Sequence, residues 1–179
     1  MGPERKIIAV FGAYAPRPGD AEYELAREMG KRIARAGWVV MNGGYSGTME
    51  ASAHGAKQAG GHVIGVTVET FSREPNAFTD ETVHTRDLWE RLQVLLDRAD
   101  AYIVLPGATG TLAEIGLAWE MQSKDLMVPK PLVFLGEFWA PLYRLMVTAP
   151  TSKAACGGRV QIVASPEKAI DFIASFLQD

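Results

Sequence analysis

Two short segments of the sequence combine glycine and threonine at the same spacing. Residues 44–48 read Gly-Tyr-Ser-Gly-Thr, and residues 107–111 read Gly-Ala-Thr-Gly-Thr. Glycines expose backbone N–H groups, threonine adds a hydroxyl, and a following helix adds its positive N-terminal end, so such a loop favours a bound phosphate. Tight turns without any ligand also use glycine, and this simpler explanation stays open for either loop taken alone. The pattern predicts a phosphate or nucleotide site formed by these residues: Gly43, Gly44, Gly47, Thr48, Pro106, Gly107, Ala108, Thr109, Gly110 and Thr111.

One arginine falls on the apolar face of a predicted helix over residues 86–98. The apolar positions of that face are Leu88, Leu92, Leu95 and Ala99. Arg91 follows Leu88 by three residues and therefore lies on the same face. A guanidinium stays charged in proteins and requires a carboxylate or phosphate partner when it faces the core. Arg91 is therefore a candidate for ligand binding or catalysis, while an ion pair with Asp87 or Asp100, or a side chain that reaches solvent, stays the structural alternative.

A carboxylate is expected one turn into the helix that follows the second glycine loop. Glu114 is favoured there by the helix dipole, but it would repel a phosphate bound at the same N-terminus. We therefore expect Glu114 to interact with a part of the ligand other than the phosphate, such as the ribose hydroxyls or a developing positive charge. The alternative is an ordinary first-turn glutamate, which many helices carry.

Short apolar runs alternate with longer stretches of helical periodicity along the whole chain. The predicted strands cover residues 6–12, 38–41, 62–67, 100–105, 131–135 and 160–163, and the predicted helices cover 21–36, 48–59, 86–98, 111–122, 137–147 and 166–177. Residues 69–82 and 106–110 are predicted loops. This alternation predicts an α/β fold, a doubly wound, Rossmann-like parallel sheet with helices on both faces, as a single domain over residues 1–179. Function is then expected in the loops at the carboxyl ends of the strands.

Length and composition exclude several classes of function. The chain has 179 residues with 18 basic and 21 acidic side chains and no basic stripe, so a nucleic-acid polymer is not an expected partner. No apolar run approaches the roughly 20 residues of a membrane span, and a signal-peptide core is missing, so we expect a cytoplasmic protein without membrane contact. Cys156 is the only cysteine and the three histidines are scattered, so no metal site is predicted. No Walker A or GxGxxG motif occurs, which argues against an NTPase and a nicotinamide dehydrogenase.

Residues 105–114, Leu-Pro-Gly-Ala-Thr-Gly-Thr-Leu-Ala-Glu, resemble the PGGxGTxxE signature of the LOG family, the cytokinin riboside 5′-monophosphate phosphoribohydrolases formerly called lysine decarboxylases. Arg91 stands nine residues before Asp100, as the family's catalytic arginine stands before its Asp-Ala-aromatic strand. Residues 42–49 are similar to the family's GGGxxGLM loop. The similarity extends over residues 10–143, which is most of the chain.

The resemblance implies hydrolysis of the N-glycosidic bond of a nucleoside 5′-monophosphate to free base and ribose 5-phosphate, without a cofactor. Arg91 and Glu114 would be the catalytic residues, and the 107–111 loop would hold the phosphate. The family also implies a homodimer, which the apolar side chains Trp89, Trp119, Phe138 and Trp139 would permit. Ala108 replaces the second glycine of the signature, and Leu92 replaces a lysine that often follows the catalytic arginine. A non-catalytic nucleotide or molybdenum-cofactor carrier therefore stays the alternative, and base recognition is expected from the 69–82 loop.

Overall fold

The computed structural model describes residues 5–71, 73–149 and 156–177, and within these ranges the chain forms seven strands and six helices. The strands are β1 (Ile7–Phe11), β2 (Val39–Asn42), β3 (Val63–Val68), β4 (Glu81–Thr85), β5 (Ala101–Val104), β6 (Leu132–Leu135) and β7 (Val160–Val163). The helices are α1 (Ala21–Arg35), α2 (Thr48–Gln58), α3 (Leu88–Arg98), α4 (Thr109–Ser123), α5 (Ala140–Thr148) and α6 (Pro166–Leu177). Strands and helices alternate except at β3 and β4, which follow each other directly.

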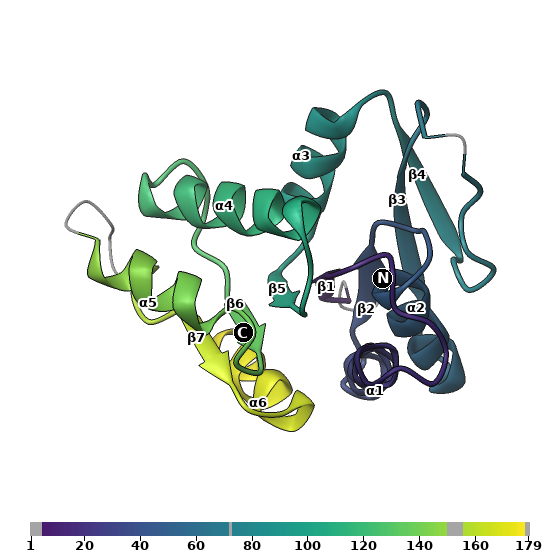
Figure 1. Cartoon of the computed structure of the whole chain (residues 1–179), viewed down its shortest axis with the longest axis horizontal. Helices are drawn as coiled ribbons and strands as arrows, with labels where there is room; N and C mark the ends of the chain where they lie inside the picture. The colour runs from purple at the N-terminus through teal and green to yellow at the C-terminus, as the bar shows by residue number, and fades with distance from the viewer. Residues whose placement is uncertain (1–4, 72, 150–155, 178–179) are drawn as a thin grey trace.

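All the strands pair in parallel in one sheet, in the order β4-β3-β2-β1-β5-β6-β7 (Figure 1). The chain moves outward from β1 in one direction to β4, then returns to the other side of β1 with β5. Strand order therefore reverses between β1 and β5, and the helices that follow these two strands, α1 and α4, pack on opposite faces of the sheet. In open parallel sheets, the crevice at the carboxyl ends of such strands is the usual place for a ligand.

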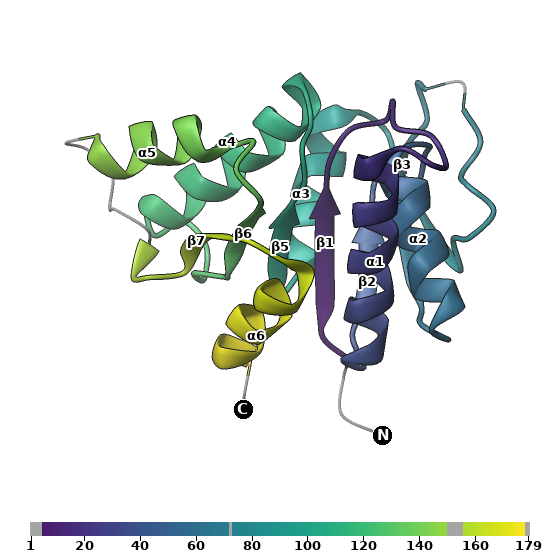
Figure 2. The ribbon, with the colours of Figure 1, turned by 60° about the horizontal axis from the view of Figure 1, so that its bottom comes forward.

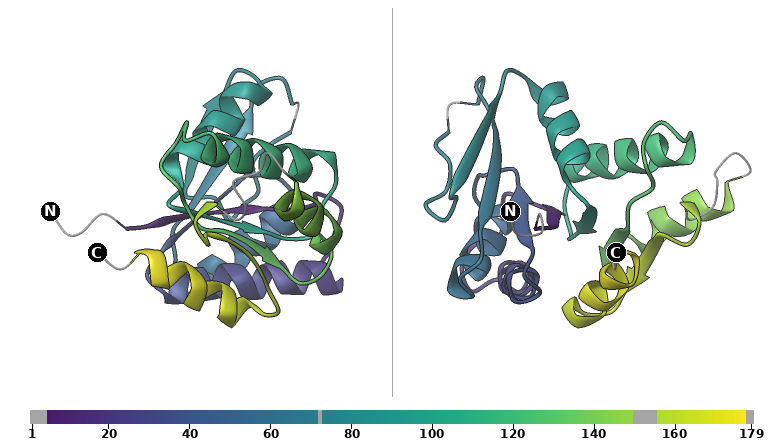
Figure 3. Two further views of the ribbon diagram at one scale, coloured as in Figure 1. Left: turned by 90° about the vertical axis from the view of Figure 1, so that its left-hand side faces the viewer. Right: turned by 180° about the vertical axis from the view of Figure 1, so that it is seen from behind.

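Helices cover both faces of the sheet and divide the core into two layers. Helices α1, α2 and α6 lie on one face, and α3, α4 and α5 lie on the other (Figures 2 and 3). In β1, Ile8 and Val10 pack into the first layer, while Ala9 and Phe11 pack into the second. Because successive side chains of a strand point to opposite faces, both layers need apolar residues, which explains the continuous apolar runs in the sequence.

These observations confirm the predicted fold class, a doubly wound, Rossmann-like parallel sheet. One strand, β4, was not predicted, and it begins at the end of the predicted 69–82 loop and runs to Thr85, just before the predicted 86–98 helix. It lies at the edge of the sheet and only Thr85 of its residues is buried, so its sequence, Glu-Thr-Val-His-Thr, lacks the apolar run of an inner strand. Helix α4 also begins earlier than predicted, since the Ala108 carbonyl already accepts from the Leu112 amide, and Thr109 and Gly110 belong to its first turn.

Two predictions about apolar side chains were wrong. Leu88, placed on the core face of α3, is 47% exposed, whereas the remaining apolar positions of that face are buried. Trp119, proposed for an apolar surface, is 2% exposed and packs in the core against Phe134 and Tyr143. Trp89 and Phe138 are exposed as expected. Within the described residues, no helix is both long and apolar enough to cross a membrane.

Candidate functional site

A cavity of about 190 Å³ opens at the carboxyl edge of the sheet, where strand order reverses. It receives residues from the loops after β1, β2, β3 and β5 and from helices α2, α3 and α4. Its lining consists of Gly12, Ala13, Tyr14, Tyr45, Met49, Phe71, Arg73, Arg91, Ala108, Thr109, Gly110, Thr111 and Glu114. Arg91 and Glu114, more than twenty residues apart in the sequence, thus share one cavity, and four residues of the second glycine loop join them.

The second glycine loop presents an open helix N-terminus to this cavity. Helix α4 begins after Ala108, which makes no side-chain cap, so the amides of the first turn are not occupied by a capping side chain. Gly107 is required because a Cβ there would lie 2.2 Å from the Thr111 hydroxyl oxygen. Gly110 differs, since a Cβ on it would meet no protein atom within 4 Å and would project into open space. The loop therefore combines backbone donors with room for an anion.

Contacts with neighbouring elements fix the start of this loop. The Trp139 indole nitrogen donates to the Leu105 carbonyl at 2.9 Å. The Ala13 amide donates to the Pro106 carbonyl at 3.2 Å, which joins the loops that follow β1 and β5. Pro106 and Gly107 lie outside the cavity lining, which begins at Ala108 in this loop, and phosphate contact by them stays a prediction.

The first glycine loop is packed differently from the second. Both the amide and the hydroxyl of Thr48 donate to the Ala13 carbonyl, at 2.9 and 3.0 Å, and Thr48 is only 1% exposed. Gly47 has a φ of 73° and packs so closely against the backbone of Ala13 and Tyr14 that a Cβ would lie 2.4 Å from it. The β1–α1 loop therefore occupies the first amide of α2 and packs against the residue before it. The Thr48 hydroxyl, which we predicted as a phosphate ligand, is engaged inside the protein.

Gly43 and Gly44 also lie outside the cavity lining, and phosphate contact by them stays a prediction. Gly44 has a φ of 76° and packs on Gly65 in the neighbouring strand. A Cβ on Gly43 would lie 1.8 Å from Nη2 of Arg91. Gly43 thus makes room for the arginine, and the first loop contributes Tyr45 and Met49 to the lining instead.

Arg91 is half-buried and is oriented by groups other than carboxylates. Its Nε donates to the Val66 carbonyl at 2.9 Å, Nη2 lies 3.9 Å from the Met49 sulfur, and Cζ lies 5.6 Å from the centre of the Tyr45 ring. The two carboxylates that could have paired with it are engaged elsewhere. Asp87 accepts from the Glu90 amide as the cap of α3, and Asp100 accepts from the Ile7 amide and lies near Lys6. The guanidinium charge is thereby left to act in the cavity.

The environment of Glu114 favours the neutral form of its carboxyl. Burial raises the pKa of its carboxyl from 4.5 to about 7, while the nearby charge of Arg91 acts in the opposite direction. The side chain keeps partial exposure, because it lines the open cavity. A carboxyl with a pKa near neutrality can exchange protons with a reacting group, and such groups cluster at active sites. In the described part of the chain, no group of three or more His, Cys, Asp or Glu side chains could hold a metal ion.

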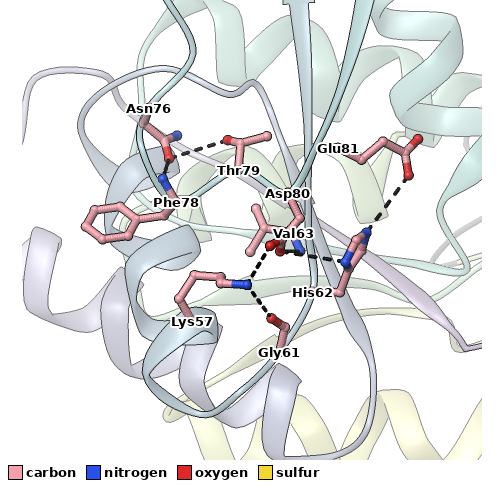
Figure 4. Close-up of polar contacts among 9 residues, drawn as sticks. All are labelled: Lys57, Gly61, His62, Val63, Asn76, Phe78, Thr79, Asp80 and Glu81. Carbon is pink, nitrogen blue, oxygen red and sulfur yellow. Dashed lines mark hydrogen bonds and ion pairs between the residues drawn. The ribbon is translucent and has the colours of Figure 1, made fainter.

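The segment between β3 and β4 supplies Phe71 and Arg73 to the cavity, and polar contacts hold its second half (Figure 4). The Asp80 carboxylate accepts from Lys57 at 2.6 Å and from the Val63 amide at 2.9 Å. Asn76 binds the first glycine loop through its amide, which donates to Gly44 O, and through its side chain, which donates to Tyr45 O. This segment is therefore attached both to the end of α2 and to the loop beside the cavity.

Sequence reasoning missed several lining residues, including Tyr14, Tyr45 and Met49. Phe71 and Arg73 were anticipated only as members of a loop that would recognise the base. Aromatic and cationic side chains in aperiodic segments give no periodic signal, so only their position after strands β1, β2 and β3 could have identified them.

Comparison with known proteins agrees with this geometry. A cytokinin riboside 5′-monophosphate phosphoribohydrolase of Mycobacterium marinum is 36% identical over 161 residues, which cover 86% of both chains. A protein of the same name from Mycobacterium tuberculosis is 40% identical over 115 residues, 63% of this chain and 61% of that protein, so this match spans less than two thirds of the relative. Among solved structures, the molybdenum cofactor binding protein of Rippkaea orientalis superposes with a TM-score of 0.78 at 27% identity, covering 98% of this chain and 99% of that chain.

A family model gives the broadest match. The model of the SLOG cluster4 family covers residues 5–170, which include every strand, both glycine loops and the Arg91–Glu114 cavity. Because this match extends over most of the chain and agrees with the Mycobacterium marinum relative, the chain belongs to the SLOG cluster4 family, as its resemblance to LOG proteins led us to expect.

Proposed function

We propose that this protein is a hydrolase that cleaves the N-glycosidic bond of a nucleoside 5′-monophosphate, of the cytokinin riboside or AMP type, to free base and ribose 5-phosphate. The observation that carries the proposal is the pairing of Glu114, whose carboxyl has a pKa of about 7, with Arg91 in one cavity at the open N-terminus of α4. Relatives named as phosphoribohydrolases at 36–40% identity support the same activity.

The phosphate would bind at the first turn of α4. Backbone amides of residues 109–111 are available there, the helix dipole favours an anion, and the open space beside Gly110 admits its oxygens. Arg91 adds a fixed positive charge to the same cavity. A cavity of about 190 Å³ is small beside the roughly 300–1,000 Å³ of pockets that enclose a whole ligand, so it suits the sugar phosphate, with the base nearer the opening.

Glu114 would act at the anomeric carbon. As the bond between this carbon and the base nitrogen breaks, positive charge develops on the sugar ring, and the ionised carboxylate stabilises it. A water oxygen then bonds to the anomeric carbon, one water proton is released through Glu114, and the base nitrogen ends up protonated. Arg91 would orient both the carboxylate and the phosphate, which reduces the cost of reaching the reactive geometry.

Side chains near the cavity opening suit a planar base. Tyr14 is 59% exposed and Phe71 is 42% exposed, and the Arg73 guanidinium lies 5.7 Å from the Tyr14 ring centre. Aromatic faces and guanidinium planes both stack on nucleobases. This arrangement supports our expectation that the 69–82 segment takes part in base recognition.

The protein can be tested by incubation with AMP, GMP, CMP, UMP and isopentenyl-AMP, followed by chromatography for free base and ribose 5-phosphate. We expect release from at least one nucleotide by the wild type and its loss in Arg91→Ala and Glu114→Gln. Exposed Glu120 on the same helix provides the control variant Glu120→Gln, which should retain activity. Full activity in both cavity variants would refute the mechanism.

A carrier of a nucleotide or of the molybdenum cofactor is the alternative. The close superposition on the Rippkaea orientalis protein favours it, as does Ala108, whose methyl group lines the cavity where the LOG signature has glycine. A carrier would release no base, although a bound nucleotide or molybdopterin compound would still raise the melting temperature.

We also propose a cytoplasmic homodimer. Trp89 is 73% exposed on α3 and Phe138 is 55% exposed just before α5, and large exposed apolar side chains of this kind are typical of subunit contacts. Light scattering after gel filtration should give twice the mass of the chain, and Trp89→Glu should shift the protein toward the monomer. A wild-type monomer would contradict this proposal.

A further inference from the structure

Tyr45 lies directly against the guanidinium of Arg91. The centre of its ring is 5.6 Å from Cζ of Arg91, and the ring itself is tilted against Phe71 at a centroid distance of 6.0 Å. A guanidinium that stacks on an aromatic face is attracted by the electrons of the ring. Tyr45 also lines the cavity, so it borders the space that Arg91 and Glu114 share.

The tyrosine ring is itself held rigidly. Tyr45 is only 5% exposed, and its hydroxyl accepts from the Val68 amide at 2.9 Å and lies 3.4 Å from the Val68 carbonyl. Its backbone carbonyl accepts from the Asn76 side chain at 3.0 Å. The ring is therefore held through its hydroxyl by the last residue of β3, and the backbone of Tyr45 is held by the segment that follows this strand.

Three further contacts limit where the guanidinium can go. The Val66 carbonyl accepts from Nε of Arg91, and the Met49 sulfur lies beside Nη2. The backbone of Gly43 lies so close to the guanidinium that a Cβ on Gly43 would overlap with Nη2. Two of the three guanidinium nitrogens thus have defined neighbours inside the protein, while the group still lines the cavity. With the ring of Tyr45 on one side, the orientation of the charge is set without any carboxylate contact.

We propose that Tyr45 is the positioning residue for Arg91, its ring face holding the guanidinium toward Glu114 and the bound nucleotide. This inference rests on the proposed function for its catalytic consequence, but the geometry it describes exists without substrate. Because an arginine remains charged at all working pH values, only its position can change its effect on Glu114.

The consequence is a pH effect at Glu114. The ionisable side chains that line the cavity with it are Tyr14, Tyr45, Arg73 and Arg91, from the loops after β1, β2 and β3 and from α3. Among these, Arg91 is the group whose charge lowers the pKa of Glu114 against the effect of burial. If the ring is removed and the guanidinium drifts away, this attraction weakens and Glu114 ionises at a higher pH.

The test compares three variants of the full chain. Tyr45→Met removes the ring but fills its space with a flexible side chain, and Tyr45→Leu does the same with a branched one. Tyr45→Phe keeps the ring and removes only the hydroxyl. Tyr102→Phe is the matched control, because Tyr102 is also buried and donates to a backbone carbonyl, that of Leu96, but does not line the cavity.

Two readouts are measured for each folded variant. The pKa of Glu114 is followed by NMR of protein with carbon-13 in its glutamate side chains, and kcat for base release is measured from pH 5.5 to 8.5. For Tyr45→Met and Tyr45→Leu we expect a higher Glu114 pKa and a kcat below that of the wild type at every pH, because Arg91 also orients the phosphate. The deficit in kcat should be about threefold larger near pH 6 than at pH 8.5. Tyr102→Phe should match the wild type in both readouts, and Tyr45→Phe should lie between the wild type and Tyr45→Met, because it keeps the ring but loses the hydroxyl bonds to Val68.

The proposal is overturned if a folded Tyr45→Met or Tyr45→Leu variant leaves the Glu114 pKa unchanged. It is also overturned if Tyr45→Phe raises the pKa as much as Tyr45→Met, because the hydroxyl bonds and not the ring face would then be responsible. Failure of the proposed function is a separate result, since a wild type without base release still reports the pKa of Glu114 by NMR.

Discussion

Replacement of Glu114 by glutamine should stabilise the protein while it removes the activity. Burial raises the pKa of Glu114 from 4.5 to about 7. Ionisation of this carboxyl therefore costs free energy in the folded protein that it does not cost in the unfolded chain. A tenfold change in proton affinity corresponds to about 1.4 kcal/mol, so complete ionisation of Glu114 costs the folded state about 3 kcal/mol. Glutamine has a similar shape and no charge, and it avoids this cost.

The sign and pH window follow from the same shift. Because the folded-state pKa lies above the unfolded one, the contribution of Glu114 to stability is fully present below pH 4.5 and is lost as pH rises through 7. The stability difference between Glu114→Gln and the wild type should therefore grow by about 2 kcal/mol between pH 5 and pH 8.

Urea denaturation of the wild type, Glu114→Gln and Glu120→Gln at pH 5, 6, 7 and 8 measures this difference. Glu120 lies exposed on the same helix and controls for the general effect of removing a negative charge. A stability difference that is the same at pH 5 and pH 8 would refute the reasoning, because it would mean that Glu114 ionises alike in the folded and unfolded states. Stabilisation at the expense of activity is the usual sign of a functional residue in a costly environment.

Three glycine and threonine positions give further predictions. Gly43→Ala should displace the Arg91 guanidinium, because its Cβ would lie 1.8 Å from Nη2, and we expect turnover to fall about tenfold or more with an almost unchanged melting temperature. Gly110→Ala should stabilise the start of α4 by up to about 1 kcal/mol in urea denaturation, because alanine favours a helix more than glycine does. The same change should weaken nucleotide binding measured by calorimetry, because the new methyl group enters the open space where we propose that the phosphate binds. Thr48→Val should cost about 1 kcal/mol of stability, because the half-buried Ala13 carbonyl loses the hydroxyl donor and keeps only the Thr48 amide. Loss of nucleotide affinity without any loss of stability would instead indicate that Thr48 is a ligand.

The fold could be predicted because each inner strand is buried on both faces and must be apolar throughout. This requirement made β1, β2, β3, β5 and β6 visible in the sequence, whereas the half-exposed edge strand β4 needed no such run. Arg91 could be found for a related reason, since a permanent charge among apolar helix positions requires a partner. The cavity wall formed by Tyr14 and Phe71 could not be found, because the loops that carry these residues have no periodicity to interpret.

The two glycine loops show where a local pattern stops being informative. Both carry GxxGT where a strand passes into a helix, but α2 begins at the last residue of its motif and α4 at the third residue of its own. Their contacts with Ala13 also differ, because the Ala13 carbonyl accepts from the amide and hydroxyl of Thr48, whereas the Ala13 amide donates to the Pro106 carbonyl. Ala13 therefore occupies one amide at the N-terminus of α2 with its carbonyl and holds the loop before α4 with its own amide. Because an anion competes for N–H donors, we expect it at the N-terminus of α4 rather than at that of α2. The Ala13 carbonyl faces the first loop and the Ala13 amide faces the second, because β2 lies on one side of β1 and β5 lies on the other. This strand order is a property of the whole fold, and neither five-residue segment contains it.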